Sequence, residues 1–137
     1  MLTFTTELYK DVFSFCLFGT SRHKTQVYKY LDNRLTDKLI SKKLISILNA
    51  INSDPLRYVH PQKFKHLEDD VWEIKIKSLR IACIWDTKPN SLIAIYAFDK
   101  KQNRWPKQKL INMRKQKSKY FNIKVKKLNG GKIERLS

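Results

Sequence analysis

The sequence predicts an α+β domain in which two helices precede a meander of three strands and a basic helix follows it. Between Thr25 and Asn52, apolar residues recur every three or four positions, which is the spacing of amphipathic helices. From Val71 to Lys77, apolar and polar residues alternate, as they do in a half-buried strand. The 137 residues, 42% of them hydrophobic, suffice for one core, so we expect a single domain over 1–137.

The first half of the chain divides into predicted strands and helices. Leu2 to Phe18 is rich in Phe, Tyr, Val and Thr, which indicates one or two short strands before the turn at Gly19-Thr20-Ser21. We expect the helical stripe that follows to form two helices that divide near Asn33. The second helix should stop at Asn52-Ser53-Asp54-Pro55, because proline lacks an N–H group and restricts the residue before it.

The predicted meander begins with the alternating segment. There Ile74 and Ile76 should face the core, whereas Glu73 and the lysines beside it should form a charged face. The short link at Lys77-Ser78 favours a hairpin into a strand from Leu79 to Asp86. The segment from Ser91 to Phe98 is almost wholly apolar, which is typical of a central strand that is covered on both faces.

Beyond the meander, Pro106 is well placed to begin a helix over roughly Lys107 to Lys119. The period-two spacing of Tyr120, Ile123 and Val125 then predicts a late strand, which ends before Asn129-Gly130-Gly131 and a frayed terminus. Residues 1–23 and 124–137 remain additions that the sequence pattern does not anchor to the rest of the domain.

Charge is the strongest compositional signal. The chain has 29 Lys plus Arg against 12 Asp plus Glu, a formal charge of +17, and no acidic residue lies between Lys100 and Ile133. Such an excess makes a compact chain repel itself, so a polyanion is the expected partner. A solvated lysine-rich surface is the alternative, but binding to phosphate backbones explains the one-sided distribution better.

Composition also indicates the cellular compartment of the protein. Cys16 and Cys83 are the only cysteines, too few for a disulfide scaffold and without the spacing of zinc ligands. No apolar stretch approaches the roughly 20 residues of a membrane span, and Glu7 and Asp11 interrupt the only segment that resembles a signal peptide. We therefore expect a cytoplasmic protein that has no structural metal.

The most specific local pattern lies at the predicted hairpin. Alternation places Lys75 and Lys77 on one face, and the return strand brings Arg80 beside them, so three cations should converge. A solvated row of cations on an open sheet face is the alternative.

From Leu67 onward the chain resembles toxins of the RelE/HigB superfamily, in particular its phage-associated HigB-like branch. The resemblance spans roughly residues 63 to 120 and depends on the order of its parts. These are Val71-Trp72-Glu73-Ile74-Lys75, Leu79-Arg80-Ile81, Ala97-Phe98-Asp99-Lys100-Lys101, and Pro106 with a basic helix.

The resemblance implies a compact RelE-like domain, with an antiparallel sheet of three to five strands flanked by an N-terminal helical pair and a C-terminal basic helix. It also implies a ribosome-dependent endoribonuclease that cuts mRNA, uses no metal or cofactor and contacts ribosomal RNA. Its inhibitor would be a cognate antitoxin, usually a helix-turn-helix DNA-binding protein.

Residue by residue, the resemblance assigns Lys75 as the general base, Lys77 as a phosphate ligand and Arg80 as the group that stabilises the cleaved phosphate. Lys101 would lie near the leaving oxygen, with Lys100 next to it. Many HigB-like relatives have arginine in place of Lys75, which leaves its role as a base open. Glu73 departs from the lysine that RelE-type enzymes can have there.

Further candidates follow from residue chemistry. His66 competes for the acid/base role, because imidazole titrates near neutrality, although a surface histidine is the alternative. Lys65, Arg104 and Arg114 are candidate phosphate ligands. Trp105 could stack on a nucleobase, but packing beside Pro106 is the alternative for this indole. A lysine base would need a lowered pKa, which crowding by other cations should produce.

Two other functions compete with the nuclease. One is a gyrase inhibitor of the ParE type, within the same superfamily, which the convergent cations argue against. The other is an RNA- or DNA-binding protein without catalysis, for which the charge alone would suffice.

Overall fold

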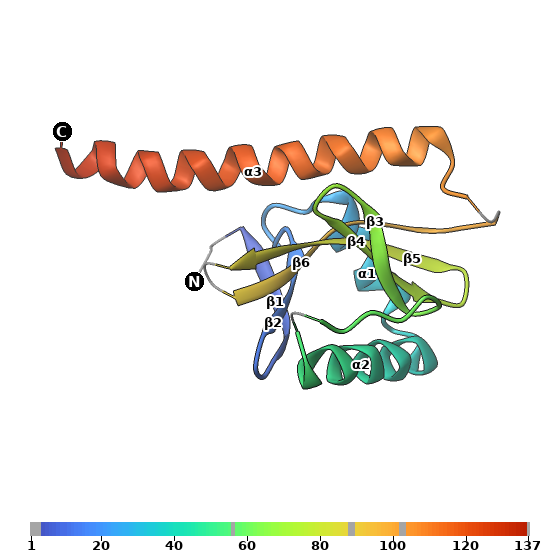
Figure 1. The fold of residues 1–137 in the computed structure, drawn as a ribbon. Helices are drawn as coiled ribbons and strands as arrows, with labels where there is room; N and C mark the ends of the chain where they lie inside the picture. The colour runs from blue at the N-terminus through green and yellow to red at the C-terminus, as the bar shows by residue number, and fades with distance from the viewer. Residues whose placement is uncertain (1–3, 56, 88–89, 102–103, 137) are drawn as a thin grey trace.

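The computed structural model describes residues 4–55, 57–87, 90–101 and 104–136. Within these residues, three helices flank one six-stranded mixed sheet with the order β1-β2-β6-β5-β4-β3 (Figure 1). This confirms the α+β class. The sheet nevertheless has more strands than the expected three to five, and it is not purely antiparallel.

The additional strands come from two places. β1 (Thr5–Lys10) and β2 (Ser14–Phe18) form a hairpin, and β2 pairs in parallel with β6 (Asn90–Asp99). The segment that the sequence left unanchored is thus joined to the centre of the sheet. β3 (Phe64–Glu68) adds the opposite edge. Only two of its five residues are apolar, which explains why no strand was predicted there.

The two predicted helices are confirmed as α1 (Gln26–Arg34) and α2 (Lys38–Ser53). The side chain of Thr25 accepts a hydrogen bond from the Tyr28 amide at the start of α1, and Asp37 does the same for Leu39 at the start of α2. These are favourable N-terminal caps. The apolar stripe is buried against the sheet at Val27, Leu31, Ile40, Leu44, Ile47, Leu48 and Ile51.

The predicted meander is also confirmed, as β4 (Val71–Ile76), β5 (Leu79–Thr87) and β6. Ile76 pairs with Leu79, so the turn consists of Lys77 and Ser78. Lys77 has a φ of 54°, in the left-handed region that a tight hairpin requires. As predicted, β6 is central and buried on both faces.

The face of β4 that was expected to be charged and open is instead partly covered. Val71 is fully buried and Glu73 is 1% exposed. Trp105 and the helix that follows it lie over this face, and the Trp105 indole donates a hydrogen bond to Glu73. Strand alternation identified the face correctly but could not show that a later segment would cover it.

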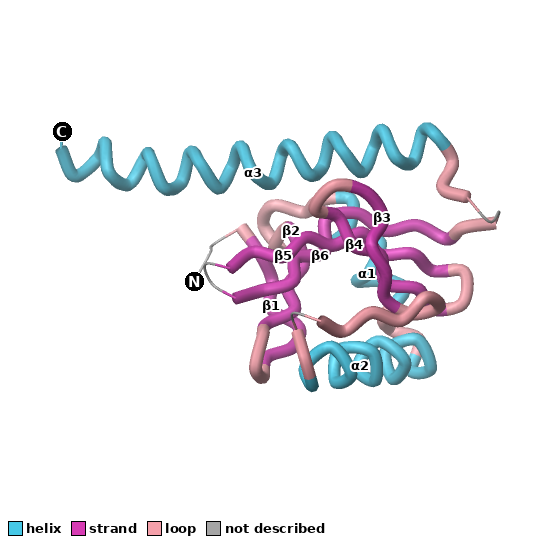
Figure 2. Tube along the Cα trace, viewed as in Figure 1, coloured by secondary structure: helices cyan, strands magenta, loops and turns pink. Residues whose placement is uncertain are grey.

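The covering helix, α3 (Lys107–Leu136), begins where Pro106 predicted and continues well past the expected end. It lies across the sheet on the side opposite α2 (Figure 2). The predicted late strand is wrong, because Tyr120, Ile123 and Val125 belong to this helix. Met113 and Tyr120 are both fully buried, and their separation of seven residues is a helical repeat.

Polar contacts at both ends of its buried face anchor α3 on the sheet. The Tyr120 hydroxyl donates to Asp86 Oδ2 at 2.8 Å, and Lys124 Nζ lies 2.5 Å from the same oxygen. Nearer the start of the helix, Arg114 forms an ion pair with Glu68. Burial and the Asp86 carboxylate raise the pKa of Tyr120, so the phenol stays neutral and acts as a donor.

None of the described helices is long and apolar enough to cross a membrane.

Replacing Tyr120 tests this anchoring. The ring packs against Phe4 and Phe18 at centroid distances of 5.3 and 5.5 Å. We expect Tyr120→Ala to lower the free energy of unfolding by about 3–5 kcal/mol, because it leaves a cavity. Tyr120→Phe keeps the ring and should cost about 1 kcal/mol. Urea denaturation measures both values, and equal losses would contradict an anchor based on ring packing.

Candidate nucleic-acid site

The antiparallel register places several predicted site residues on one face of the sheet. Lys75 and Arg80 are directly opposed across β4 and β5, and Lys65 is opposed to Glu73 across β3 and β4. Lys100 joins them because its backbone amide donates to the Ser78 carbonyl at 2.8 Å. We call Lys65, Lys75, Arg80 and Lys100 the cation cluster.

A buried carboxylate lies at the centre of this cluster. Glu73 Oε2 is 3.8 Å from Arg80 Nε and accepts the hydrogen bond from the Trp105 indole. The other oxygen, Oε1, has no hydrogen-bond partner among the described residues. A buried charge is costly unless it is paired. Glu73 therefore depends on the surrounding cations, and in turn it limits their mutual repulsion.

The pKa of Lys75 is lowered, as the sequence suggested for a lysine base. Burial is the main cause, and the neighbouring amine of Lys65 is the next. The charge of Glu73 opposes the shift, whereas that of Arg80 adds to it. Lys75 Nζ also donates to the Pro61 carbonyl at 3.2 Å, which directs the amine toward the loop before β3.

Lys100 has a similar environment at the other side of the cluster. Burial lowers its pKa, Glu73 opposes the shift, and Arg80 and Lys65 add to it. The cluster thus contains two amines that release a proton more readily than an exposed lysine. One can serve as a base when neutral, and the other as an acid when protonated.

Arg80 is held in a defined orientation. Its Nη1 donates to the carbonyls of Lys77 and Leu79, at 2.5 and 3.0 Å. Of the three cations expected to converge, Lys75 and Arg80 are cross-strand partners, whereas Lys77 is exposed in the turn. Lys101 and Arg104 are exposed on either side of residues 102 and 103, and neither forms an ion pair with a described residue.

His66 lies on the other face of the sheet. It is opposed to Trp72 on β4. Trp72 and Lys75 are three residues apart on this strand, so their side chains point to opposite faces of the sheet. Its ring packs edge-on against Trp72 at 5.7 Å, and Nε2 lies 2.5 Å from the Asp69 carbonyl oxygen. The structure therefore does not bring His66 to the cation cluster, which leaves the surface histidine as the better interpretation.

Two further candidates are engaged in structural contacts. Trp105 is 9% exposed and packs edge-on against Phe98 at 4.5 Å, so its indole lies among core side chains and presents little surface to a nucleobase. Arg114 forms two hydrogen bonds to the Glu68 carboxylate, at 2.8 and 2.7 Å. That pair links α3 to β3.

Sequence reasoning did not place Lys43, Lys63 or Glu73 among the residues of the site. Lys43 lies on α2 and Lys63 before β3, yet both line one pocket of about 330 Å³ with Lys75 and Lys77. No local motif relates a residue of α2 to this pocket. The only available signal was the hairpin pair itself, from which neighbours on other elements cannot be deduced.

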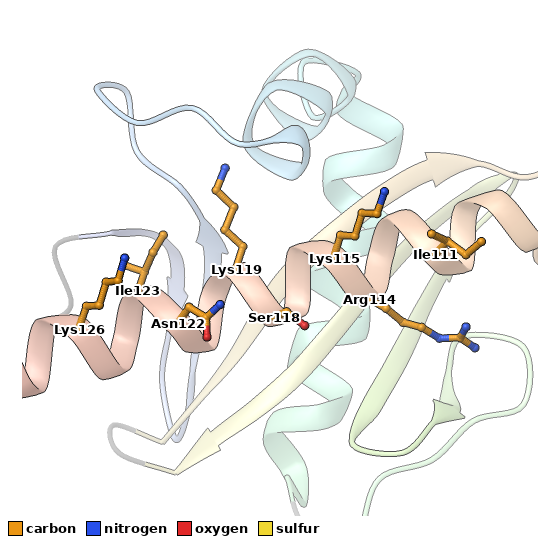
Figure 3. Close-up of a pocket in the computed structure, with 8 residues that line it drawn as sticks. All are labelled: Ile111, Arg114, Lys115, Ser118, Lys119, Asn122, Ile123 and Lys126. Atoms are coloured by element: carbon orange, nitrogen blue, oxygen red, sulfur yellow. The ribbon is translucent and has the colours of Figure 1, made fainter.

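A second hollow, of about 680 Å³, follows one face of α3 (Figure 3). In Figure 3, Lys115 and Lys119 point to the same side of the helix, whereas Arg114 points elsewhere. The lining residues are Ile111, Arg114, Lys115, Ser118, Lys119, Asn122, Ile123 and Lys126. Four of the eight are basic and none is acidic, which makes this face suitable for contact with a phosphate backbone.

Among the described residues, no three His, Cys, Asp or Glu side chains form a group that could hold a metal ion. The hydrogen-bond donors of the cation cluster are three lysine amines and one guanidinium group. Such a set suits an anionic ligand.

Comparison with known proteins gives one family match. The model of the family described as phage derived protein Gp49-like (DUF891) matches residues 33–118. This span includes every member of the cation cluster as well as Glu73. No curated protein matches the chain.

The electrostatic role of Glu73 can be tested with Glu73→Gln. Removing the negative charge should lower the pKa of Lys75 and Lys100 further, because the carboxylate favours their protonated forms. Glutamine still offers an oxygen to the Trp105 indole. Lysine-detected NMR titration measures both pKa values. Glu68→Gln is the matched control, and an unchanged pKa of Lys75 in Glu73→Gln would contradict the assignment.

Proposed function

The chain belongs to the phage-derived Gp49-like family, which is part of the RelE/HigB-like toxin superfamily, and on this basis we propose that it is the toxin of a type II toxin–antitoxin system. Its activity is the endonucleolytic cleavage of mRNA on the ribosome, without a metal ion. The observation that carries the proposal is the cross-strand pair of Lys75 and Arg80, with Lys100 beside it.

In the proposed reaction, the 2′-hydroxyl of the RNA attacks the adjacent phosphorus. The new O2′–P bond forms as the P–O5′ bond breaks, which gives a 2′,3′-cyclic phosphate and a 5′-hydroxyl end. Neutral Lys75 takes the proton of the 2′-hydroxyl, and its lowered pKa increases the fraction of the amine that can do so at neutral pH.

Arg80 stabilises the negative charge that develops on the phosphoryl oxygens. Its two hydrogen bonds to the carbonyls of Lys77 and Leu79 fix one side of the guanidinium group. Within the described part of the chain, no hydrogen bond occupies Nη2, so this nitrogen is available to an oxyanion. A guanidinium that is already oriented loses little entropy when the phosphate binds.

Lys100 completes the reaction by protonating the departing 5′-oxygen. The resemblance placed Lys101 nearest this oxygen. We favour Lys100 because it faces the charges of Glu73 and Arg80 and has a lowered pKa, whereas Lys101 is exposed. Lys77, at the rim of the site, holds a phosphate of the bound strand.

The proposed partners follow from the same charge distribution. The basic face of α3 supports a contact with ribosomal RNA, since its hollow is lined by four cations and no carboxylate. The cognate antitoxin would be a separate polypeptide, of the helix-turn-helix DNA-binding class. A plain nucleic-acid binder is the second candidate function, favoured by the fact that this basic face lies outside the cation cluster.

Arg80→Ala separates these functions. We expect cleavage of ribosome-bound mRNA to fall by roughly 10²–10³-fold, as for the loss of one oxyanion donor, with loss of toxicity in a growth assay. Co-sedimentation with ribosomes should be retained, and thermal unfolding verifies that the variant folds. Arg22→Ala, a surface change of equal charge, is the control.

A parallel, gradual loss of binding and effect in both variants would instead indicate a binder without catalysis. DNA damage without RNA cleavage by the unmodified protein would indicate a gyrase inhibitor.

Lys75→Arg tests the base. Arginine keeps the positive charge but remains protonated throughout the accessible pH range. The unmodified protein should cleave faster as pH rises toward the lowered pKa of Lys75, because deprotonation activates the base. In Lys75→Arg the rate should fall by roughly 10²–10⁴-fold and lose this rise. Single-turnover cleavage across pH measures it, with Lys77→Arg as the control. Undiminished cleavage by Lys75→Arg would exclude Lys75 as the base.

A further inference from the structure

The pocket that Lys43 and Lys63 line with Lys75 and Lys77, which we call the lysine pocket, adjoins the cation cluster. Lys43 and Lys63 have no role in the reaction described above. The pocket measures about 330 Å³ and lies where α2 meets the end of β4 and the loop before β3. Eight residues from these three places line it, and four of them are lysines. The lining residues are Lys43, Ser46, Ile47, Gln62, Lys63, Lys75, Ile76 and Lys77. The volume is in the lower range of small-ligand pockets.

The pocket concentrates positive charge without compensation. No carboxylate is among its lining residues, and no ion pair involves Lys43, Lys63 or Lys77 within the described parts of the chain. Elsewhere the pattern is different. On α3, Arg114, Lys117 and Lys124 each lie beside a carboxylate. Like charges held together repel, so binding of an anion here would relieve unfavourable energy.

The pocket also has apolar and neutral polar lining residues. Ile47 and Ile76 are almost fully buried, at 4% and 2% exposure, and give the pocket fixed apolar walls. Ser46 and Gln62 add neutral donors at the wall. The combination suits a phosphate oxygen, which accepts several hydrogen bonds at once.

Lys75 connects the two sites. It is opposed to Arg80 within the cation cluster, and it also lines the lysine pocket. A phosphate bound at Arg80 and an anion in the pocket would therefore share one lysine. Consecutive phosphates of a single RNA strand provide such a pair of anions.

We propose that the lysine pocket is a second phosphate subsite, in which Lys43 and Lys63 bind the backbone phosphate that neighbours the one held at Arg80. Only the assignment of the Arg80 phosphate as the scissile one rests on the proposed function. The subsite holds the strand in register, so that a particular phosphodiester lies at the cation cluster.

The test measures binding without cleavage. A fluorescent single-stranded RNA, 2′-O-methylated so that no 2′-hydroxyl can attack, is titrated with the full chain by anisotropy. We expect Lys43→Ala and Lys63→Ala each to weaken binding about fivefold at low salt. Each should also reduce the slope of log K against log salt by about 0.7. Lys42→Ala, on the same helix but outside the lining, is the matched control and should change little.

A second set of RNAs identifies the phosphate. In each, one phosphodiester is replaced by an uncharged methylphosphonate. Replacement of the phosphate next to the one held at Arg80 should weaken binding to the unmodified protein and have no further effect on the Lys43→Ala, Lys63→Ala double variant, whereas replacement of the phosphate at Arg80 should weaken binding to both proteins. Two results would overturn the subsite: equal effects of Lys42→Ala and Lys43→Ala, or equal losses of affinity at every methylphosphonate position. Either result would mean that the positive charge of the whole surface, and not one pocket, attracts the RNA.

The subsite and the nuclease can fail independently. If the methylphosphonate pattern holds but the unmodified protein cuts no ribosome-bound mRNA, the subsite stands and the proposed function is wrong. If mRNA is cut but the pocket variants bind RNA like the control, the subsite is wrong and the nuclease stands. Thermal unfolding of each variant verifies the fold, which should persist because Lys43 and Lys63 are exposed.

Discussion

The burial of one carboxylate among several cations is the constraint on which this structure depends. Glu73 is 1% exposed, interacts with the Arg80 guanidinium and accepts the Trp105 indole hydrogen bond. Both Lys75 and Lys100 feel the positive charges of Arg80 and Lys65, and the charge of Glu73 opposes their effect on the two amines. The same carboxylate draws the segment before α3 over the sheet, so one group links the packing of the domain to its electrostatics.

The sheet converts this constraint into a site. Opposed residues on antiparallel strands share a face, and the β4–β5 register therefore determines that Lys75 lies beside Arg80. The tight turn at Lys77 supplies carbonyl acceptors for the guanidinium group. Rigid strands hold such groups more accurately than loops do. A chain with a charge of +17 has cations nearly everywhere, and in the cation cluster Lys75 and Arg80 are both oriented by hydrogen bonds and partly desolvated.

The surrounding surfaces extend the site in two directions. The lysine pocket lies beside Lys75, whereas the basic face of α3 lies outside the cation cluster. The family match at residues 33–118 covers the cluster and the pocket, while β1 and β2 precede it. These two strands extend the sheet through the parallel pairing of β2 with β6, and thus support the central strand from which Lys100 follows.

The sequence by itself determined the elements whose signals are local. Helical spacing and a proline stop gave α1 and α2, and alternation gave β4, β5 and the pairing of Lys75 with Arg80. Tertiary structure decided the rest, because it depends on contacts between distant segments. The parallel strand β2, the length of α3, the burial of Trp105, the opposite face of His66 and the convergence of Lys43 on Lys75 all arise from packing. Short-range periodicity contains no information about which distant surface will cover a face.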